Sequence, residues 1–282
     1  MHLTDERVAS AELDYLADAL RPPCSLGAFE LTGQLARSTT ALLFTARGGA
    51  FGLDSEGVLK ITGSAYAPIL QRELALLQQA AAAGIDNLVR PLGDALLWLP
   101  AGGERAARPA AAMAVPFLAG GDLAALAERS GRTGGLGVAL ALAVARPLGE
   151  ALRGLLTELP RPVVHADVRA QNVLLPFPTS LPTEVQLIDL DAAHELDTDL
   201  QHPGAEGARL LAEDVRGYGE ILHLLAGGSS TASRSLDQLI AECREQRLTS
   251  LADPRLWHTL AAAERAQMAP RGWLNGLLRA FR

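Results

Sequence analysis

The spacing of apolar and polar residues divides the chain into a strand-rich first part and a helical second part. Apolar residues recur at helical spacing from Thr4 to Leu20, which predicts a helix ending where Arg21-Pro22-Pro23 interrupt its hydrogen bonds. From Phe29 to Arg47 the pattern becomes that of β-strands, and a Gly-Gly turn separates it from a further strand at Gly57 to Thr62. The first part is therefore expected to be one helix followed by a small sheet.

Long aliphatic segments predict that the second part is helical. Leu136 to Leu159 predicts one long helix, either kinked or begun afresh at Pro147. Another helix is expected from Asp214 to Gly228, since an Asp at a helix start is commonplace as an N-cap. Ser229 to Arg282 is helical in pattern, and its amphipathic last residues are expected to pack on the protein rather than on a membrane.

Composition and charge exclude several classes of function. The 282 residues carry a formal charge of -7 and no basic stripe, so no nucleic-acid partner is expected. The two cysteines lie far apart without metal-ligand spacing, which fits a reducing compartment. The acidic N-terminus is not a signal peptide, and the most apolar run is too short to be a transmembrane segment. The expected location is the cytoplasm.

Two short stretches carry the residues best suited to chemistry. Val163 to Leu175 reads VVHADVRAQNVLL, with His165, Asp167 and Asn172, and a second stretch, LIDLDAA, contains Asp189. Their order and spacing resemble the catalytic loop and the metal-binding segment of protein kinases. The predicted helix from Asp214 resembles the central helix of the kinase large lobe, which implies that Asp214 caps the backbone of the catalytic loop. The resemblance implies that Asp167 accepts the proton of an acceptor hydroxyl, while Asn172 and Asp189 hold Mg²⁺ on the phosphates of ATP.

The strand-rich part contains matches to the phosphate-binding half of a kinase. Lys60, the only lysine of the chain, stands where the family has its strand lysine, and Glu73 follows thirteen residues later on a predicted helix. The resemblance implies that Lys60 contacts the α and β phosphates and that Glu73 holds it by an ion pair. Ala36, Ser38 and Ala41 replace the three glycines of the glycine-rich loop, which is expected to stiffen that loop and weaken nucleotide binding.

The segment Ala111 to Leu123 resembles the hinge between the kinase lobes. On this alignment Val115 lies behind the adenine, Pro116 offers its carbonyl and Leu118 its N–H to the ring, and Asp122 reaches the ribose. Proline suits the first of these roles because only its carbonyl is required.

The chain departs from the family pattern in three places. Ala166 replaces the Arg that pairs with a phosphorylated activation loop, so switching by loop phosphorylation is not expected. Arg169 stands where Ser/Thr kinases have Lys and is expected to stabilise the γ-phosphate. Only 24 residues lie between Asp189 and Asp214, and the A-P-E motif is reduced to a possible remnant at Glu206. This short acidic segment leaves room for a basic partner, a small molecule or no external substrate.

The resemblance implies an α+β, two-lobed protein kinase-like fold with an antiparallel-sheet small lobe and a helical large lobe. Residues 1–28 form a helical extension, 29–116 the small lobe, and 117–282 the large lobe with its C-terminal helices. The expected activity is Mg²⁺- and ATP-dependent phosphoryl transfer to a hydroxyl, foremost of protein Ser/Thr. Two alternatives stay open: a small-molecule kinase like the aminoglycoside phosphotransferases, and a pseudokinase that serves as a binding module.

Overall fold

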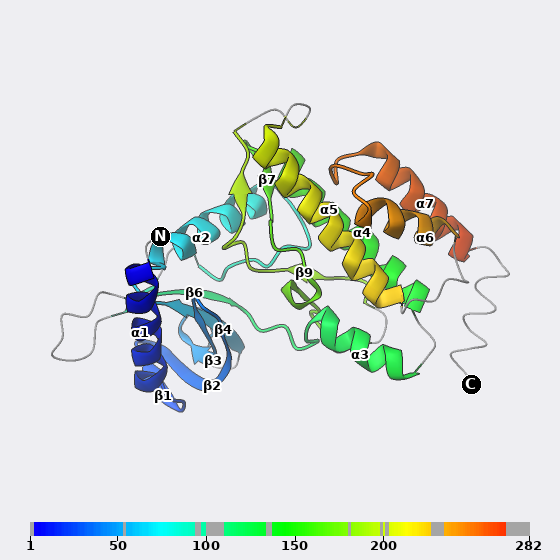
Figure 1. Ribbon diagram of the computed structural model, residues 1–282. Coiled ribbons are helices and arrows are strands. Elements are labelled where there is room, and N and C mark those ends of the chain that lie inside the picture. The colour runs from blue at the N-terminus through cyan, green and yellow to red at the C-terminus, as the bar shows by residue number, and fades with distance from the viewer. Residues whose placement is uncertain are drawn as a thin grey trace. The chain divides into compact units, whose positions relative to one another are not determined.

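The computed structural model describes residues 3–52, 55–93, 97–99, 110–133, 137–179, 182–197, 200, 203–226 and 234–268 (Figure 1). The chain forms two compact units. The first comprises Met1–Gln79 and Val89–Phe117, and the second comprises Ala80–Leu88 and Leu118–Arg282. The lobe boundaries expected after residues 28 and 116 stay predictions.

The first unit is built on one antiparallel sheet of six strands in the order β1-β2-β3-β4-β6-β5. The strands are β1 Cys24–Leu26, β2 Phe29–Arg37, β3 Leu42–Gly48, β4 Glu56–Thr62, β5 Leu97–Leu99 and β6 Ala110–Pro116. Lys60 lies in β4, with Leu43 and Met113 opposite it in the neighbouring strands. Gly48 and Gly49 have φ of 78° and 54° at the predicted turn, where the 3-10 helix Gly49–Phe51 begins, and such angles favour glycine.

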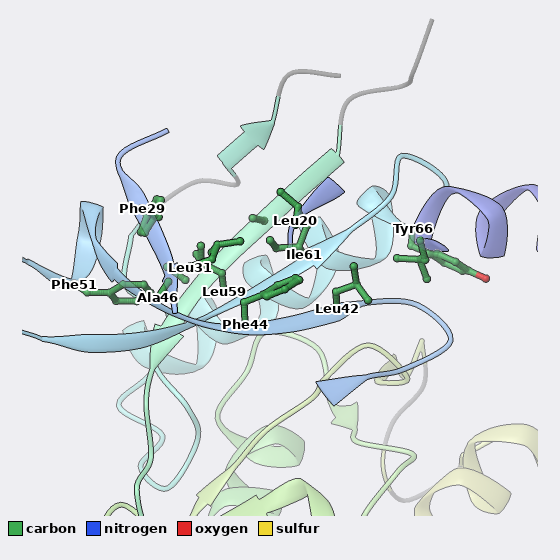
Figure 2. Packing of buried hydrophobic residues seen from close by; sticks show 13 residues of the cluster. Leu20, Phe29, Leu31, Leu42, Phe44, Ala46, Phe51, Leu59, Ile61 and Tyr66 are labelled. Carbon is green, nitrogen blue, oxygen red and sulfur yellow. The ribbon is translucent and has the colours of Figure 1, made fainter. Parts of the chain in front are cut away.

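An N-terminal helix completes the core of the first unit. Helix α1, Leu3–Ala19, ends before the two prolines as the sequence predicts. Leu13 of this helix and Leu20 just beyond it belong to one buried cluster with Phe44 and Ile61 of the sheet (Figure 2). The extension is therefore an integral part of this unit, because its removal would expose the apolar cluster to water.

Five helices form most of the described part of the second unit. They are α3 Leu123–Thr133, α4 Gly137–Thr157, α5 Ala205–Ala226, α6 Arg234–Arg244 and α7 Pro254–Met268. Helix α4 continues through Pro147, so the expected fresh start at that residue is wrong. Its buried face packs against α5 and α7, and α6 packs against both α5 and α7.

Helix α5 begins earlier than the sequence suggests. Its first residue is Ala205, so Asp214 lies in the interior of the helix and the expected helix start at this residue is wrong. The helix also includes Glu206, which is an exposed first-turn residue paired with Arg209 at 2.6 Å. Tyr218 of α5 is fully buried and donates a hydrogen bond to the Ala145 carbonyl at 2.8 Å, which ties α5 to α4.

Short strands between α4 and α5 carry the candidate catalytic residues. β7 Val163–Val164 pairs antiparallel with β10 His194–Glu195, and β8 Val173–Leu174 pairs antiparallel with β9 Gln186–Leu187. The 3-10 helix Ala170–Asn172 leads into β8. Over the residues with assigned positions, no helix combines the length and apolarity that crossing a bilayer requires. The C-terminal amphipathic stretch lies outside the described residues.

Candidate active site

Asp214 fixes the backbone of the candidate catalytic loop. Its carboxylate accepts hydrogen bonds from the N–H groups of His165 at 2.7 Å and Ala166 at 2.8 Å. The side chain is buried, and burial raises the pKa of Asp214 while His165 and the two donors act in the opposite direction. Asp214 thus supports the loop as the resemblance implies, although it does so from the middle of α5.

Two residues of this region have left-handed backbones without being glycine. Ala166 has φ of 62° and Asp189 has φ of 70°. A non-glycine residue in this conformation costs on the order of 1–3 kcal/mol and persists only where its surroundings hold it. The hydrogen bonds that the Asp214 carboxylate accepts from the N–H groups of His165 and Ala166 supply that restraint at Ala166. Such strain is concentrated at functional sites.

Asp167 lies at the centre of a polar group within the second unit. Its Oδ2 atom accepts a hydrogen bond from Asn172 Nδ2 at 2.8 Å and lies 3.1 Å from Arg169 Nη2. Asn172 Nδ2 also donates to the Asp167 backbone carbonyl at 2.9 Å. The carboxylate is about one-third exposed at 33%. It is therefore oriented by two partners on one oxygen while it keeps access to solvent.

The two candidate metal ligands are linked through the backbone. Asn172 and Asp189 flank the paired strands β8 and β9, and the Ile188 N–H donates to the Asn172 carbonyl at 2.9 Å. Both Nδ2 bonds of the buried Asn172 go to Asp167, which leaves its amide oxygen as the atom suited to a hard cation. Among the residues with described positions, no three His, Cys, Asp or Glu side chains form a metal cluster. One carboxylate and one amide oxygen still fit Mg²⁺, which takes its remaining ligands from water and phosphates.

His165 has a structural part in this arrangement. The ring is fully buried, its Nδ1 accepts the Asp167 N–H at 3.3 Å, and its Nε2 lies 3.0 Å from the Ile188 carbonyl. The first bond requires an unprotonated Nδ1, so the proton is on Nε2 and is donated to Ile188. His165 therefore connects the loop of Asp167 to the segment of Asp189.

Lys60 and Glu73 form a buried ion pair within the first unit. Glu73 lies on α2, Ala67–Ala82, and its Oε2 is 2.8 Å from Lys60 Nζ. The side chains are 2% and 13% exposed for Glu73 and Lys60, respectively. Few carboxylates are buried to this degree without a charged partner. The ion pair that the resemblance implies between Lys60 and Glu73 is present in the structure.

The loop that replaces the glycine-rich loop closes on itself. The Ser38 hydroxyl accepts hydrogen bonds from the N–H groups of Thr40 at 3.2 Å and Ala41 at 3.0 Å. The Ser38 N–H donates to the Ala41 carbonyl at 2.9 Å, and Thr62 of β4 donates its hydroxyl to the Thr40 carbonyl at 2.7 Å. Ala36 lies in β2 just before this turn. Two amides that could meet a phosphate are therefore occupied by Ser38.

The hinge residues divide between the two units. Pro116 ends β6 in the first unit, whereas Leu118 and Asp122 belong to the second. Asp122 Oδ1 accepts the Ala125 N–H at 2.9 Å and so caps the start of α3. This structural role occupies one carboxylate oxygen of the residue that the resemblance places at the ribose.

Sequence reasoning missed one group of residues next to Asp167. One face of α5 presents Glu213, Arg216, Gly217 and Glu220 to the loop Ala166–Gln171. Their spacing of three and four residues is the period of a helix face and was visible in the sequence. Reading Asp214 as the start of the helix concealed this face, which extends to both sides of that residue.

Comparison with known proteins identifies the fold. No protein-family model and no curated protein sequence matches the chain. The solved kinase domain of PF14_0431 matches with a TM-score of 0.53 and 15% identity over 74% of this chain and 67% of its own. The BubR1 kinase domain matches with a TM-score of 0.60 and 12% identity over 99% of this chain and 97% of its own. The chain therefore has the protein kinase-like fold, with an antiparallel-sheet small lobe and a helical large lobe, as the resemblance of the two short stretches implied.

Proposed function

We propose that the protein transfers the γ-phosphoryl group of ATP to a hydroxyl, with protein Ser/Thr as the foremost acceptor and Mg²⁺ as the cofactor. The observation that carries this proposal is the group around Asp167. A carboxylate oriented by Asn172 and Arg169 is suited to accept the proton of an attacking hydroxyl. Kinase-like structural neighbours support the same class of reaction without specifying the acceptor.

In this proposal each predicted residue has one task. Asp167 takes the hydroxyl proton, and Lys60, held by Glu73, contacts the nucleotide phosphates. Asn172 and Asp189 would hold Mg²⁺, which neutralises the phosphate charge when bound. Arg169 exchanges its contact with Asp167 for the γ-phosphate, which leaves the carboxylate free to act as a base.

The nucleotide contacts and the compartment also belong to the proposal. Pro116 and Leu118 bind the adenine, Asp122 contacts the ribose through the carboxylate oxygen that does not cap α3, and Ala36, Ser38 and Ala41 cover the phosphates. The charge of -7 supports the lack of a nucleic-acid partner, and the cytoplasm is the proposed compartment because the two cysteines lie far apart without metal-ligand spacing.

Replacing Asp189 by Asn tests the reaction directly. Incubation with γ-labelled ATP and Mg²⁺ should label an acceptor in the wild type and nothing in the variant, because the neutral amide weakens the metal site. Asp197→Asn is the matched control, since Asp197 is 88% exposed and pairs only with Arg161 in the described part of the chain. Full transfer by the Asp189 variant would refute the assignment.

A small-molecule acceptor is the second candidate, and the start of α5 favours it. Because α5 begins at Ala205, only 13 residues lie between Asp191 and this helix. A protein substrate normally rests on this segment, and its shortness reduces the surface available to a peptide. Analysis of both the protein fraction and the low-molecular-weight fraction in the labelling experiment distinguishes the two acceptors.

A pseudokinase that serves as a binding module is the third candidate, favoured by the hydrogen bonds of Ser38 within its own turn. Thermal unfolding with and without ATP separates it from an enzyme. ATP at a hundred times its dissociation constant stabilises by about 2.7 kcal/mol, whereas a module without a nucleotide site shows no shift.

A further inference from the structure

A cleft of about 670 Å³ lies beside Asp167, entirely within the second unit. One wall is the loop Ala166–Gln171, and the other is a face of α5 that extends from Glu213 to Leu224. A volume of this size suits a small hydroxyl compound or a few residues of a peptide. The cleft contains the carboxylate that the proposed function names as the base, so its chemistry bears on the acceptor.

The floor of the cleft is a close contact between helix and loop. A Cβ atom added at Gly217 would lie 2.3 Å from the Val168 carbonyl oxygen, so only glycine lets α5 approach the loop there. One turn on either side, the helix carries longer side chains at Glu213 and Glu220. The apolar end is formed by Ile221 and Leu224, and Leu224 is 46% exposed. The cleft thus offers a charged region next to Asp167 and an apolar region farther along α5.

Most charges that line the cleft already have a partner. The matched pairs are Asp167 with Arg169 at 3.1 Å, Glu213 with Arg209, and Glu220 with Arg244 at 3.0 Å. Arg209 also pairs with Glu206. Arg216 is the exception: its side chain is exposed and has no ion-pair or hydrogen-bond partner among the residues that the structure describes.

The existing ion pairs decide whether a cationic or an anionic group binds in the cleft with the smaller loss of free energy. A cationic group would have to displace an arginine from Glu213 or Glu220. An anionic group can pair with Arg216 without breaking an existing ion pair. Guanidinium groups bind carboxylates and phosphates through two parallel hydrogen bonds, so Arg216 would also orient such a group.

We propose that this cleft is the acceptor site and that it selects a hydroxyl compound with an anionic group, either a carboxylate or a phosphate, which pairs with Arg216. The proposal rests on the proposed phosphotransfer. The bond between the γ-phosphorus and the bridging oxygen of the nucleoside triphosphate breaks, and a bond from that phosphorus to the acceptor oxygen forms. The nucleoside diphosphate leaves with the bridging oxygen, and the hydroxyl proton passes to Asp167.

Matched probes test whether the cleft selects an anionic acceptor and whether that acceptor is a protein or a small molecule. A short peptide with serine next to aspartate is compared with the same peptide carrying asparagine or lysine instead, and glycerate is compared with glycerol. With labelled ATP and Mg²⁺, the wild type should use the anionic member about 10- to 100-fold better in kcat/KM, as expected for one charge-assisted contact. Preference within the peptide set indicates a protein acceptor, and preference within the glycerate pair indicates a small molecule.

Substitutions at Arg216 separate recognition from a structural effect. Arg216→Ala should raise KM for the anionic probe until its kcat/KM equals that of the neutral probe, and Arg216→Glu should reverse the preference toward the lysine peptide. Arg265→Ala is the control, because Arg265 is an exposed arginine of α7 away from the cleft lining. A wild type without the anionic preference, or a preference that survives Arg216→Ala, overturns the proposal.

A general acceptor distinguishes failure of this inference from failure of the proposed function. Histone, a basic protein rich in hydroxyl groups, is tested in parallel with the probes. Transfer to histone without transfer to the anionic probes leaves the phosphotransferase intact and overturns the selection by Arg216. Absence of transfer to every acceptor, water included, refutes the proposed function itself.

Discussion

Replacing Lys60 by Met provides a quantitative test of the ion pair in the first unit. The substitution keeps an unbranched side chain of similar length, so the main loss is the ammonium that lies 2.8 Å from a carboxylate with 2% exposure. Removing one partner of a buried ion pair costs about 3–5 kcal/mol, since the other charge stays buried without compensation. For a chain of this size, that loss corresponds to a Tm decrease of roughly 6 to 20 °C.

The pH dependence of this loss identifies its cause. Protonation of Glu73 removes the uncompensated charge in the variant, so the difference in Tm between wild type and Lys60→Met should shrink as the pH falls from 8 to 5. Calorimetric or circular dichroism melts at several pH values measure it. Arg47→Met is the control in the same sheet, because Arg47 and Glu56 are 57% and 33% exposed and 4.0 Å apart. That exposed pair should contribute less than about 1 kcal/mol. Equal Tm changes in the two variants, or a loss that is independent of pH, would refute the reasoning.

Three further substitutions test other parts of the structure. Gly217→Ala places a Cβ against the Val168 carbonyl, so it should lower Tm and abolish labelling, whereas Gly204→Ala, with open space around it, should do neither. Ser38→Ala should tighten ATP binding about threefold to tenfold in a titration, because it releases the two backbone N–H groups that donate to the Ser38 hydroxyl. Ser38→Thr keeps a hydroxyl and should not change the affinity. Weaker ATP binding by Ser38→Ala would contradict the idea that Ser38 competes with the phosphates for these N–H groups. Burial raises the pKa of Cys243 to about 12 from 9.0, so its contribution to the free energy of unfolding is complete below pH 9 and decreases as the pH rises from 9 toward 12. Urea unfolding at pH 8 to 10.5 should show a steeper decline for wild type than for Cys243→Ala, and parallel curves would exclude this linkage.

Local sequence patterns were sufficient to predict the elements that are determined by residues close together in the chain. Helix α1 has its apolar spacing and its terminating prolines within twenty residues, and both are present in the structure. The loop around Asp167 was recognised for the same reason, because its residues are neighbours in the chain. Asn172 contacts Asp167 across only four intervening residues.

Long-range contacts decided the features that the sequence did not predict correctly. Asp214 is separated from His165 by 49 positions. Its carboxylate accepts a hydrogen bond from the backbone N–H of His165 rather than from an N–H of its own helix. The usual preference of Asp for helix starts therefore misplaced the beginning of α5. Helix α4 was expected to be either kinked or begun afresh at Pro147, yet it continues through this residue, packed against α5 and α7. Arg216 was not predicted as a binding residue because the ion pairs of the other cleft charges include partners on another helix, such as Arg244, which pairs with Glu220.

A single ε-amino group on this chain has a practical consequence. Within these 282 residues, reagents that acylate or reductively methylate lysine can reach only Lys60 besides the terminal amine. Its 13% exposure and its bond to Glu73 should make that reaction slow. Isotopic methylation would then give one side-chain signal in an NMR spectrum, which makes this position a built-in reporter of nucleotide occupancy. Coupling the protein to a surface through its lysine side chains would, in turn, consume the residue proposed to hold the phosphates.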